Sequence, residues 1–216
     1  MLERFKTVYQ PSEIEIIEKK SRFIGQAFPV ENEEAALGHL AAVRRAHVRA
    51  GHNCFAWQIG LNDQFARQSD DGEPAGTAGM PILDLLRKEG IKNTMVVVTR
   101  YFGGVLLGTG GLVRAYGRAA KEAVTLAPVI EKILYQKFSI KCPYHLSGKL
   151  QYEILQAGHV LHDQIYAGDV EFIVFAEHKS ADRLAARITD ISASQARVSL
   201  IEHTYCAEVN RKFITF

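Results

Sequence analysis

Cysteine is scarce in this sequence. The three cysteines, Cys54, Cys142 and Cys206, are odd in number and widely separated, with no spacing typical of paired thiols. A small domain held together by disulfides is therefore excluded. We expect three free thiols and a reducing, cytoplasmic environment.

Long apolar runs and a strong net charge are also missing. No run approaches the ~20 apolar residues that a membrane-spanning helix needs. The N-terminus, with Glu3, Arg4 and Lys6, lacks the apolar centre of a signal peptide. The net charge is only +2, so a nucleic-acid partner would have to bind a local patch. We expect a soluble protein that does not contact membranes.

The N-terminal half is predicted to mix strands and helices. Alternating polar and apolar residues indicate an antiparallel pair of strands, 12–18 and 22–30, around a turn at Lys19–Ser21. Asn32 is a predicted N-cap for a helix that ends near Ala50 and Gly51. Further elements are a strand at 53–60, a long polar connection at 61–79, a helix from Pro81 to Gly90, a strand around 96–99 and a helix at 110–127.

The C-terminal half has a simple predicted order. Strands and helices alternate as strand, helix, strand, strand, helix, strand, with Ser180 as the expected N-cap of the second helix. This βαββαβ order is that of the ferredoxin-like fold. Pro128 to Lys132 is the predicted boundary, since a proline disfavours continuation of the preceding helix. The sequence therefore predicts an α+β protein with two domains, 1–130 and 131–216.

The most unusual segment is a glycine-rich loop between a strand and a helix. The β-branched run at 96–99 leads into Gly103, Gly104, Gly108, Gly110 and Gly111, after which a helix starts with Thr109 as a predicted N-cap. Backbone N–H groups at such a helix N-terminus can bind an anion. The segment nevertheless fails both common nucleotide motifs, because no lysine follows Gly108 and the dinucleotide pattern meets Val113 where its third glycine should stand. Contact with a nucleic-acid backbone, which needs only exposed donors, stays open.

Basic and aromatic residues surround this loop. Arg114, Arg118 and Lys121 are predicted to share one face of the helix, although a solvated face screened by Glu122 is an equally acceptable interpretation. Tyr101, Phe102 and Tyr116 could stack on bases, but such residues more often belong to a core, and Phe102 is the first of the three expected there. The full predicted nucleic-acid or anion-binding set is Lys19, Lys20, Arg22, Arg100, Tyr101, Gly103, Gly104, Thr109, Gly110, Gly111, Arg114, Arg118 and Lys121.

A second segment, 69–79, is acidic and rich in small residues. Asp70, Asp71, Glu73 and Thr77 are predicted to line one wall of a cleft, with residues 100–118 as the other wall and Gly103 and Gly104 letting the walls meet closely. The carboxylates could hold Mg²⁺. They could equally cap turns or pair with Arg100. We predict no metal, no cofactor and no catalytic residue.

These two segments carry a resemblance. Ser69–Gly79 and Arg100–Gly117, with Lys19–Phe23 ahead of them, resemble the YigZ/Impact family over residues 18–120. The resemblance implies an N-terminal domain like the second domain of ribosomal protein S-five, an α/β sandwich. It also implies a C-terminal ferredoxin-like domain like the last domain of elongation factor G.

The resemblance further implies translation-linked regulation through RNA or the ribosome. Eukaryotic relatives inhibit a starvation-sensing kinase through an additional N-terminal domain. This chain begins near its first strand, so that activity is not expected of it. Two other functions stay open at this point: a protein-interaction adaptor, and an enzyme that acts on a phosphorylated small molecule with an acidic metal site.

Overall fold

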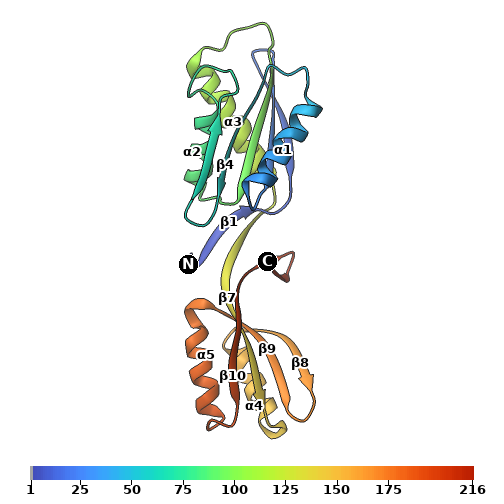
Figure 1. The fold of residues 1–216 in the computed structure, drawn as a ribbon, viewed down its shortest axis with the longest axis vertical. Coiled ribbons are helices and arrows are strands. Elements are labelled where there is room, and N and C mark those ends of the chain that lie inside the picture. Colours follow the sequence, from blue (N-terminus) through green and yellow to red (C-terminus); the bar gives the residue numbers. More distant parts are fainter. Residues whose placement is uncertain (1) are drawn as a thin grey trace. The chain divides into compact units, whose positions relative to one another are not determined.

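The computed structural model describes residues 2–216. The chain divides into two compact units, residues 1–131 and 132–216. Each contains a sheet with helices packed on it, as Figure 1 shows, and each has apolar core clusters of its own. The predicted α+β class with two domains is confirmed. No helix in the described part of the chain is long and apolar enough to cross a membrane.

The first unit is an antiparallel sheet with helices on both faces. The strand order is β2-β3-β6-β4-β5. The strands are β2 (Ser12–Glu18), β3 (Ser21–Pro29), β4 (His52–Ile59), β5 (Phe65–Ser69) and β6 (Thr94–Tyr101). Three helices cover the sheet, namely α1 (Glu33–Ala46), α2 (Gly79–Glu89) and α3 (Thr109–Leu126).

Alternation along the central strands produces two cores. Val96 and Val98 of β6 face α2 and α3, whereas Met95 and Val97 face α1. Because both faces are covered, β4 and β6 are buried almost throughout, polar residues included. Helix α3 can lie close to the sheet because its buried stripe is mostly alanine, and a Cβ on Gly25 of β3 would come within 2.5 Å of the Ala119 carbonyl oxygen.

Local sequence signals explain most helix ends. Asn32 caps α1 as predicted, accepting from the Ala35 N–H at 2.8 Å. Gly90 ends α2 in the left-handed conformation that glycine favours. The predicted cap at Thr109 is wrong, because Thr109 is already helical and Gly108 precedes it without a side-chain cap.

The second unit has the predicted βαββαβ order. Its elements are β7 (Val129–Cys142), α4 (Tyr144–Gln156), β8 (Val160–Tyr166), β9 (Val170–Glu177), α5 (His178–Ile191) and β10 (Arg197–Val209). The strand order β10-β7-β9-β8 is antiparallel throughout, and β11 (Lys212–Thr215) extends it beside β10. The predicted N-cap at Ser180 is wrong, because α5 begins at His178.

Three strands lie where none was predicted. They are β1 (Arg4–Val8), β5 and β11. Strand β5 lies within the connection predicted at 61–79, and it pairs with β4 at the edge of the sheet. Its residues are polar or exposed, so the alternation that marks a half-buried strand is absent.

Candidate nucleic-acid interface

The segment between β5 and α2, residues 70–79, is here called the acidic loop. Asp70 fixes its path, because its carboxylate accepts from the backbone N–H groups of Gly76, Ala78 and Gly79 at 2.8 to 2.9 Å. Burial alone would raise the pKa of Asp70. The three N–H donors outweigh that effect, so the pKa lies below its usual value. The loop is therefore held in one conformation by its own first carboxylate.

Asp71 ties the acidic loop to β4 and α1. Its carboxylate accepts from the Asn53 N–H at 2.7 Å and from Arg44 at 2.8 Å. Its main-chain carbonyl lies 2.8 Å from Nδ1 of His52. Because a carbonyl can only accept, Nδ1 of His52 carries the proton. This bond orients the His52 ring so that Nε2 lies 3.8 Å from Glu73.

Glu73 points inward and forms a buried ion pair. Its Oε1 accepts from Arg100 Nη1 at 2.7 Å and from the Tyr116 hydroxyl at 2.7 Å. Arg100 is only 5% exposed and Glu73 only 9%. We call Glu73, Arg100 and Tyr116, together with the partly exposed His52 beside them, the buried cluster. It joins the acidic loop to β4, β6 and α3.

Arg100 has further partners inside the first unit. Its Nη2 lies 3.4 Å from Ser21 Oγ, and its guanidinium lies 5.4 Å from the ring of Phe23 and 5.6 Å from the ring of Phe102. Two aromatic rings and a carboxylate therefore hold this side chain. Its predicted contact with a phosphate would require it to leave those partners.

The carboxylates of the acidic loop do not converge. Asp70 caps a turn, Asp71 binds Asn53 and Arg44, and Glu73 pairs with Arg100. Among residues 2–216, no three acidic, histidine or cysteine side chains form a group that could hold a metal. Turn capping and pairing with Arg100, the alternatives open from the sequence, are the arrangements observed.

Neighbouring groups are poorly suited to nucleophilic chemistry. Burial raises the pKa of Cys54 to about 12, and its thiol donates to the Asp70 carbonyl at 3.0 Å. Burial also raises the pKa of Tyr116. Both groups are therefore protonated at neutral pH. A thiol reacts as a nucleophile only in its ionised form, so Cys54 is not reactive there.

A cleft of about 470 Å³ opens above the buried cluster. Its floor contains His52, Glu73 and Arg100, and Pro74 of the acidic loop forms one side. Phe102, Leu106 and Leu107 form an apolar side, and the first turn of α3 completes it with Gly108, Thr109 and Leu112. We call it the aromatic cleft. The aromatic cleft therefore contains residues from both predicted walls: Glu73 from the acidic one, and Arg100 and Thr109 from the other.

A second hollow, of about 240 Å³, lies beside it. Lys19, Arg114 and Arg118 line this hollow around Gly111 and Ala115, together with Leu107 and the carboxylate of Glu18. We call it the basic hollow. All three cations are exposed, and Arg118 also pairs with Glu122 at 2.7 Å. Leu107 lines both hollows, so the first turn of α3 lies between them.

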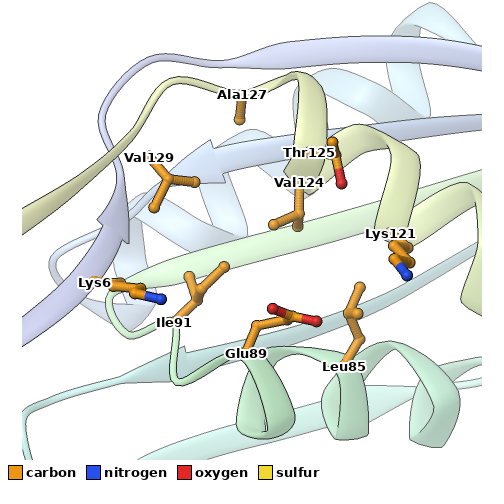
Figure 2. A pocket seen from close by; sticks show the side chains of 9 residues that line it. All are labelled: Lys6, Leu85, Glu89, Ile91, Lys121, Val124, Thr125, Ala127 and Val129. Carbon is orange, nitrogen blue, oxygen red and sulfur yellow. The ribbon is translucent and has the colours of Figure 1, made fainter.

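The remaining predicted cations lie outside the basic hollow. Lys20 is exposed in the β2–β3 turn. Arg22 pairs with Glu15 at 2.7 Å and lies 5.3 Å from the ring of Tyr101, whose hydroxyl is 3.0 Å from His47. Lys121 lines a separate hollow, drawn in Figure 2, where Lys6 and Glu89 also point inward over an apolar floor.

Phe102 is exposed, contrary to our prediction. Its exposed fraction is 59%, whereas Tyr116, which was placed after Phe102 as a core residue, is fully buried. The ring of Tyr116 packs edge-on against Phe23 at 5.2 Å. Phe102 comes after the last residue of β6, where the sheet no longer determines which side chains are covered.

Gly103 does allow a close approach, but not to the predicted partner. A Cβ there would lie 2.0 Å from the Lys20 carbonyl carbon, so the glycine packs on the β2–β3 turn and not on the acidic loop. Its N–H donates to Ser21 Oγ at 3.1 Å. Gly104 has open space around it and a φ of +82°, so it serves a turn.

The other predicted residues have local roles. Thr77 is buried and donates to the Pro74 carbonyl at 2.6 Å, within the acidic loop. Gly110 and Gly111 lie in the first turn of α3, where a Cβ on Gly111 would lie 3.0 Å from Leu107.

Two residues of the buried cluster, His52 and Tyr116, are absent from the predicted site. Strand alternation and helical spacing place each on an inward face, but neither pattern identifies Glu73 as the partner.

Comparison with known proteins defines the family. The Impact N-terminal domain matches residues 19–124, and a domain of unknown function, DUF1949, matches residues 140–195. The IMPACT family member YvyE of Bacillus subtilis is 37% identical over 205 residues, which cover 95% of this chain and 94% of that protein. The chain belongs to the IMPACT family. The resemblance found in the sequence is thus confirmed.

Other IMPACT relatives differ in how much they share. The family member YigZ of Escherichia coli is 35% identical over 85% of this chain and 91% of its own length. Protein IMPACT of Mus musculus is 36% identical over 44% of this chain and 31% of its own length. A crystal structure titled as that of a hypothetical protein is 33% identical, with a TM-score of 0.61, over 94% of this chain and 99% of its own.

Proposed function

We propose that this IMPACT family member is a cytoplasmic regulatory protein that binds RNA, free or within the ribosome, through its N-terminal unit. Membership of the family supports a regulatory or translation-linked role in general. The basic hollow supports the finer proposal. Its three exposed cations come from the β2–β3 turn and from α3, two elements far apart in the sequence.

This arrangement suits the backbone of a nucleic acid. Phosphates are bound mainly by lysine and arginine and by backbone N–H groups. Lys19 and Arg114 carry no ion pair among the described residues, so their charges are available to a ligand. The N–H groups that open α3 have no side-chain cap and lie beside the same hollow. The acidic side chains of the acidic loop oppose an RNA ligand less than the sequence suggests, because Arg100 and Arg44 neutralise Glu73 and Asp71.

Charge reversal in the basic hollow tests the proposal. Binding of a fluorescein-labelled RNA at about 50 mM salt would be measured by anisotropy for the wild type and for the double variant Lys19→Glu/Arg114→Glu. We expect the double variant to lose roughly tenfold or more in affinity, because each removed phosphate contact weakens binding regardless of base sequence.

The matched control is Arg45→Glu. Arg45 is exposed on α1, which covers the opposite face of the sheet, so this variant makes one charge reversal, half of that in the double variant, at a place distant from the hollow. We expect its RNA affinity to stay near that of the wild type. Absence of RNA binding by the wild type, or an equal loss in both variants, would overturn the proposal.

A further inference from the structure

The aromatic cleft differs in chemistry from the basic hollow beside it. We propose that this cleft takes one unpaired nucleobase of a bound RNA strand, while a neighbouring phosphate of the same strand lies in the basic hollow. The inference rests on the proposed function, and it adds that the protein selects single-stranded over double-stranded RNA.

The apolar side of the cleft suits a planar ring. Phe102 is 59% exposed and Leu106 is 83% exposed, although apolar side chains of this size gain by leaving water. The guanidinium of Arg100, itself fixed by Glu73, lies 5.6 Å from the Phe102 ring and so helps to hold the ring in place. An exposed aromatic ring that is already oriented is the usual platform on which unpaired bases stack.

The floor of the cleft offers a hydrogen-bond acceptor to a base edge. Oε1 of Glu73 is occupied by Arg100 and Tyr116, whereas Oε2 has no donor among residues 2–216. Every nucleobase carries at least one N–H donor on its Watson–Crick edge. In a duplex those donors are already paired, so only an unpaired base can offer one to Glu73.

The position of the cleft favours RNA over a protein segment as its occupant. Leu107 and the first turn of α3 separate the cleft from three exposed cations. A nucleotide joins a planar, partly apolar base to a phosphate in the same way, with the two chemistries side by side. An apolar peptide side chain would fill the cleft but bring no negative charge to Lys19 and Arg114, which carry no ion pair among the described residues. The cleft volume of about 470 Å³ also falls within the range of small-ligand sites, about 300 to 1,000 Å³.

Three oligonucleotides separate base contacts from phosphate contacts. They are a single-stranded RNA of twelve nucleotides, the same strand with central abasic positions, and the corresponding duplex. We expect the wild-type chain to bind the intact single strand roughly tenfold more tightly than the other two, because loss of one stacked base typically costs about five- to a hundredfold in affinity.

Two protein variants locate the contact. Phe102→Ala should lose roughly tenfold in affinity for the intact strand and should no longer distinguish it from the abasic strand. Leu106→Gln removes an exposed apolar side chain without touching Arg100, so it tests the same wall if Phe102→Ala is poorly folded by circular dichroism. Phe65→Ala is the control, because Phe65 is similarly exposed but lies on β5 outside the cleft.

The outcomes are distinct. If RNA binds but the abasic strand, the duplex and both cleft variants match the intact wild-type complex, the base site is wrong and the proposed function stands. If the cleft variants instead lose a protein partner while RNA affinity is unchanged, the base site is equally wrong. If no RNA binds to the wild type at all, the proposed function itself fails.

Discussion

Arg100 and Arg114 lie fourteen positions apart in one segment, yet the fold gives them opposite surroundings. Arg100 is 5% exposed, pairs with Glu73 at 2.7 Å and has two aromatic rings within 5.6 Å of its guanidinium. Arg114 is exposed on α3 and lines the basic hollow. We infer that Arg100 holds the acidic loop in place, whereas Arg114 is available to a ligand. The residue types and their spacing in the sequence do not show which of the two arginines has the structural role and which is free to bind a ligand.

The largest effect is expected from breaking the buried pair. Glu73→Ala leaves Arg100 charged, buried and without its carboxylate, which should lower the free energy of unfolding by about 3–5 kcal/mol. Urea denaturation followed by circular dichroism measures the loss. Glu122→Ala is the control, because it breaks the exposed pair with Arg118 and should have little effect. Similar losses in the two variants would contradict the contrast between buried and exposed cations.

Gly103 and Gly104 should respond differently to alanine. A Cβ on Gly103 would meet the backbone of Lys20 at 2.0 Å, so Gly103→Ala must displace the β2–β3 turn and should cost about 1–3 kcal/mol or more. The new Cβ in Gly104→Ala would meet no neighbouring atom. The only penalty is that alanine must hold a positive φ, which should lower the free energy of unfolding by about 1–2 kcal/mol.

Thermal unfolding ranks these variants. Gly117→Ala provides a control of opposite sign, since Gly117 lies inside α3 with nothing near its missing Cβ and alanine favours a helix by up to about 1 kcal/mol. If Gly103→Ala is as stable as the wild type, the turn does not pack as closely as described here.

A smaller effect is expected from acid. The pKa of Asp70 is depressed in the folded protein, mainly because three backbone N–H donors outweigh the effect of burial. Its charged form therefore stabilises the fold above the unfolded pKa of about 3.9, and this contribution is lost as the pH falls through the folded pKa. The stability difference between the wild type and Asp70→Asn should be largest near pH 7 and shrink below about pH 4.

A difference in stability that is constant with pH would show that the charge of Asp70 does not hold the loop. Asp182→Asn, at an exposed position on α5, serves as the control.

Much of the fold follows from local signals. Asn32 and Gly90 act at helix ends as their chemistry predicts, and the alternation in β2 and β3 gives the correct hairpin. Strand β5 could not be found in this way, because an edge strand is specified by its pairing with β4 and not by its own apolar residues. Phe102 and Tyr116 show the same limit, since which of two aromatic rings is covered depends on elements distant in the sequence.

The candidate site was less predictable than the fold. The glycine-rich loop and the acidic loop were recognised as partners, yet Glu73 meets Arg100 across 27 positions and Tyr116 across 43. Contacts at that separation leave no periodic signal in one sequence. The pairing of Glu73 with Arg100 was one of several alternatives, and the tertiary structure selects it by placing Glu73 beside both Arg100 of β6 and Tyr116 of α3.

The salt dependence of RNA binding tests the central claim most directly. The slope of log K against log salt concentration would be measured for the wild type and for Lys19→Gln/Arg114→Gln/Arg118→Gln. With one phosphate in the basic hollow and its two neighbours on the strand also met by these three exposed cations, the slope should become shallower by about two in the variant, since each phosphate contact with single-stranded RNA contributes about 0.7. An unchanged slope would contradict the account, because it would place the phosphate contacts elsewhere on the protein.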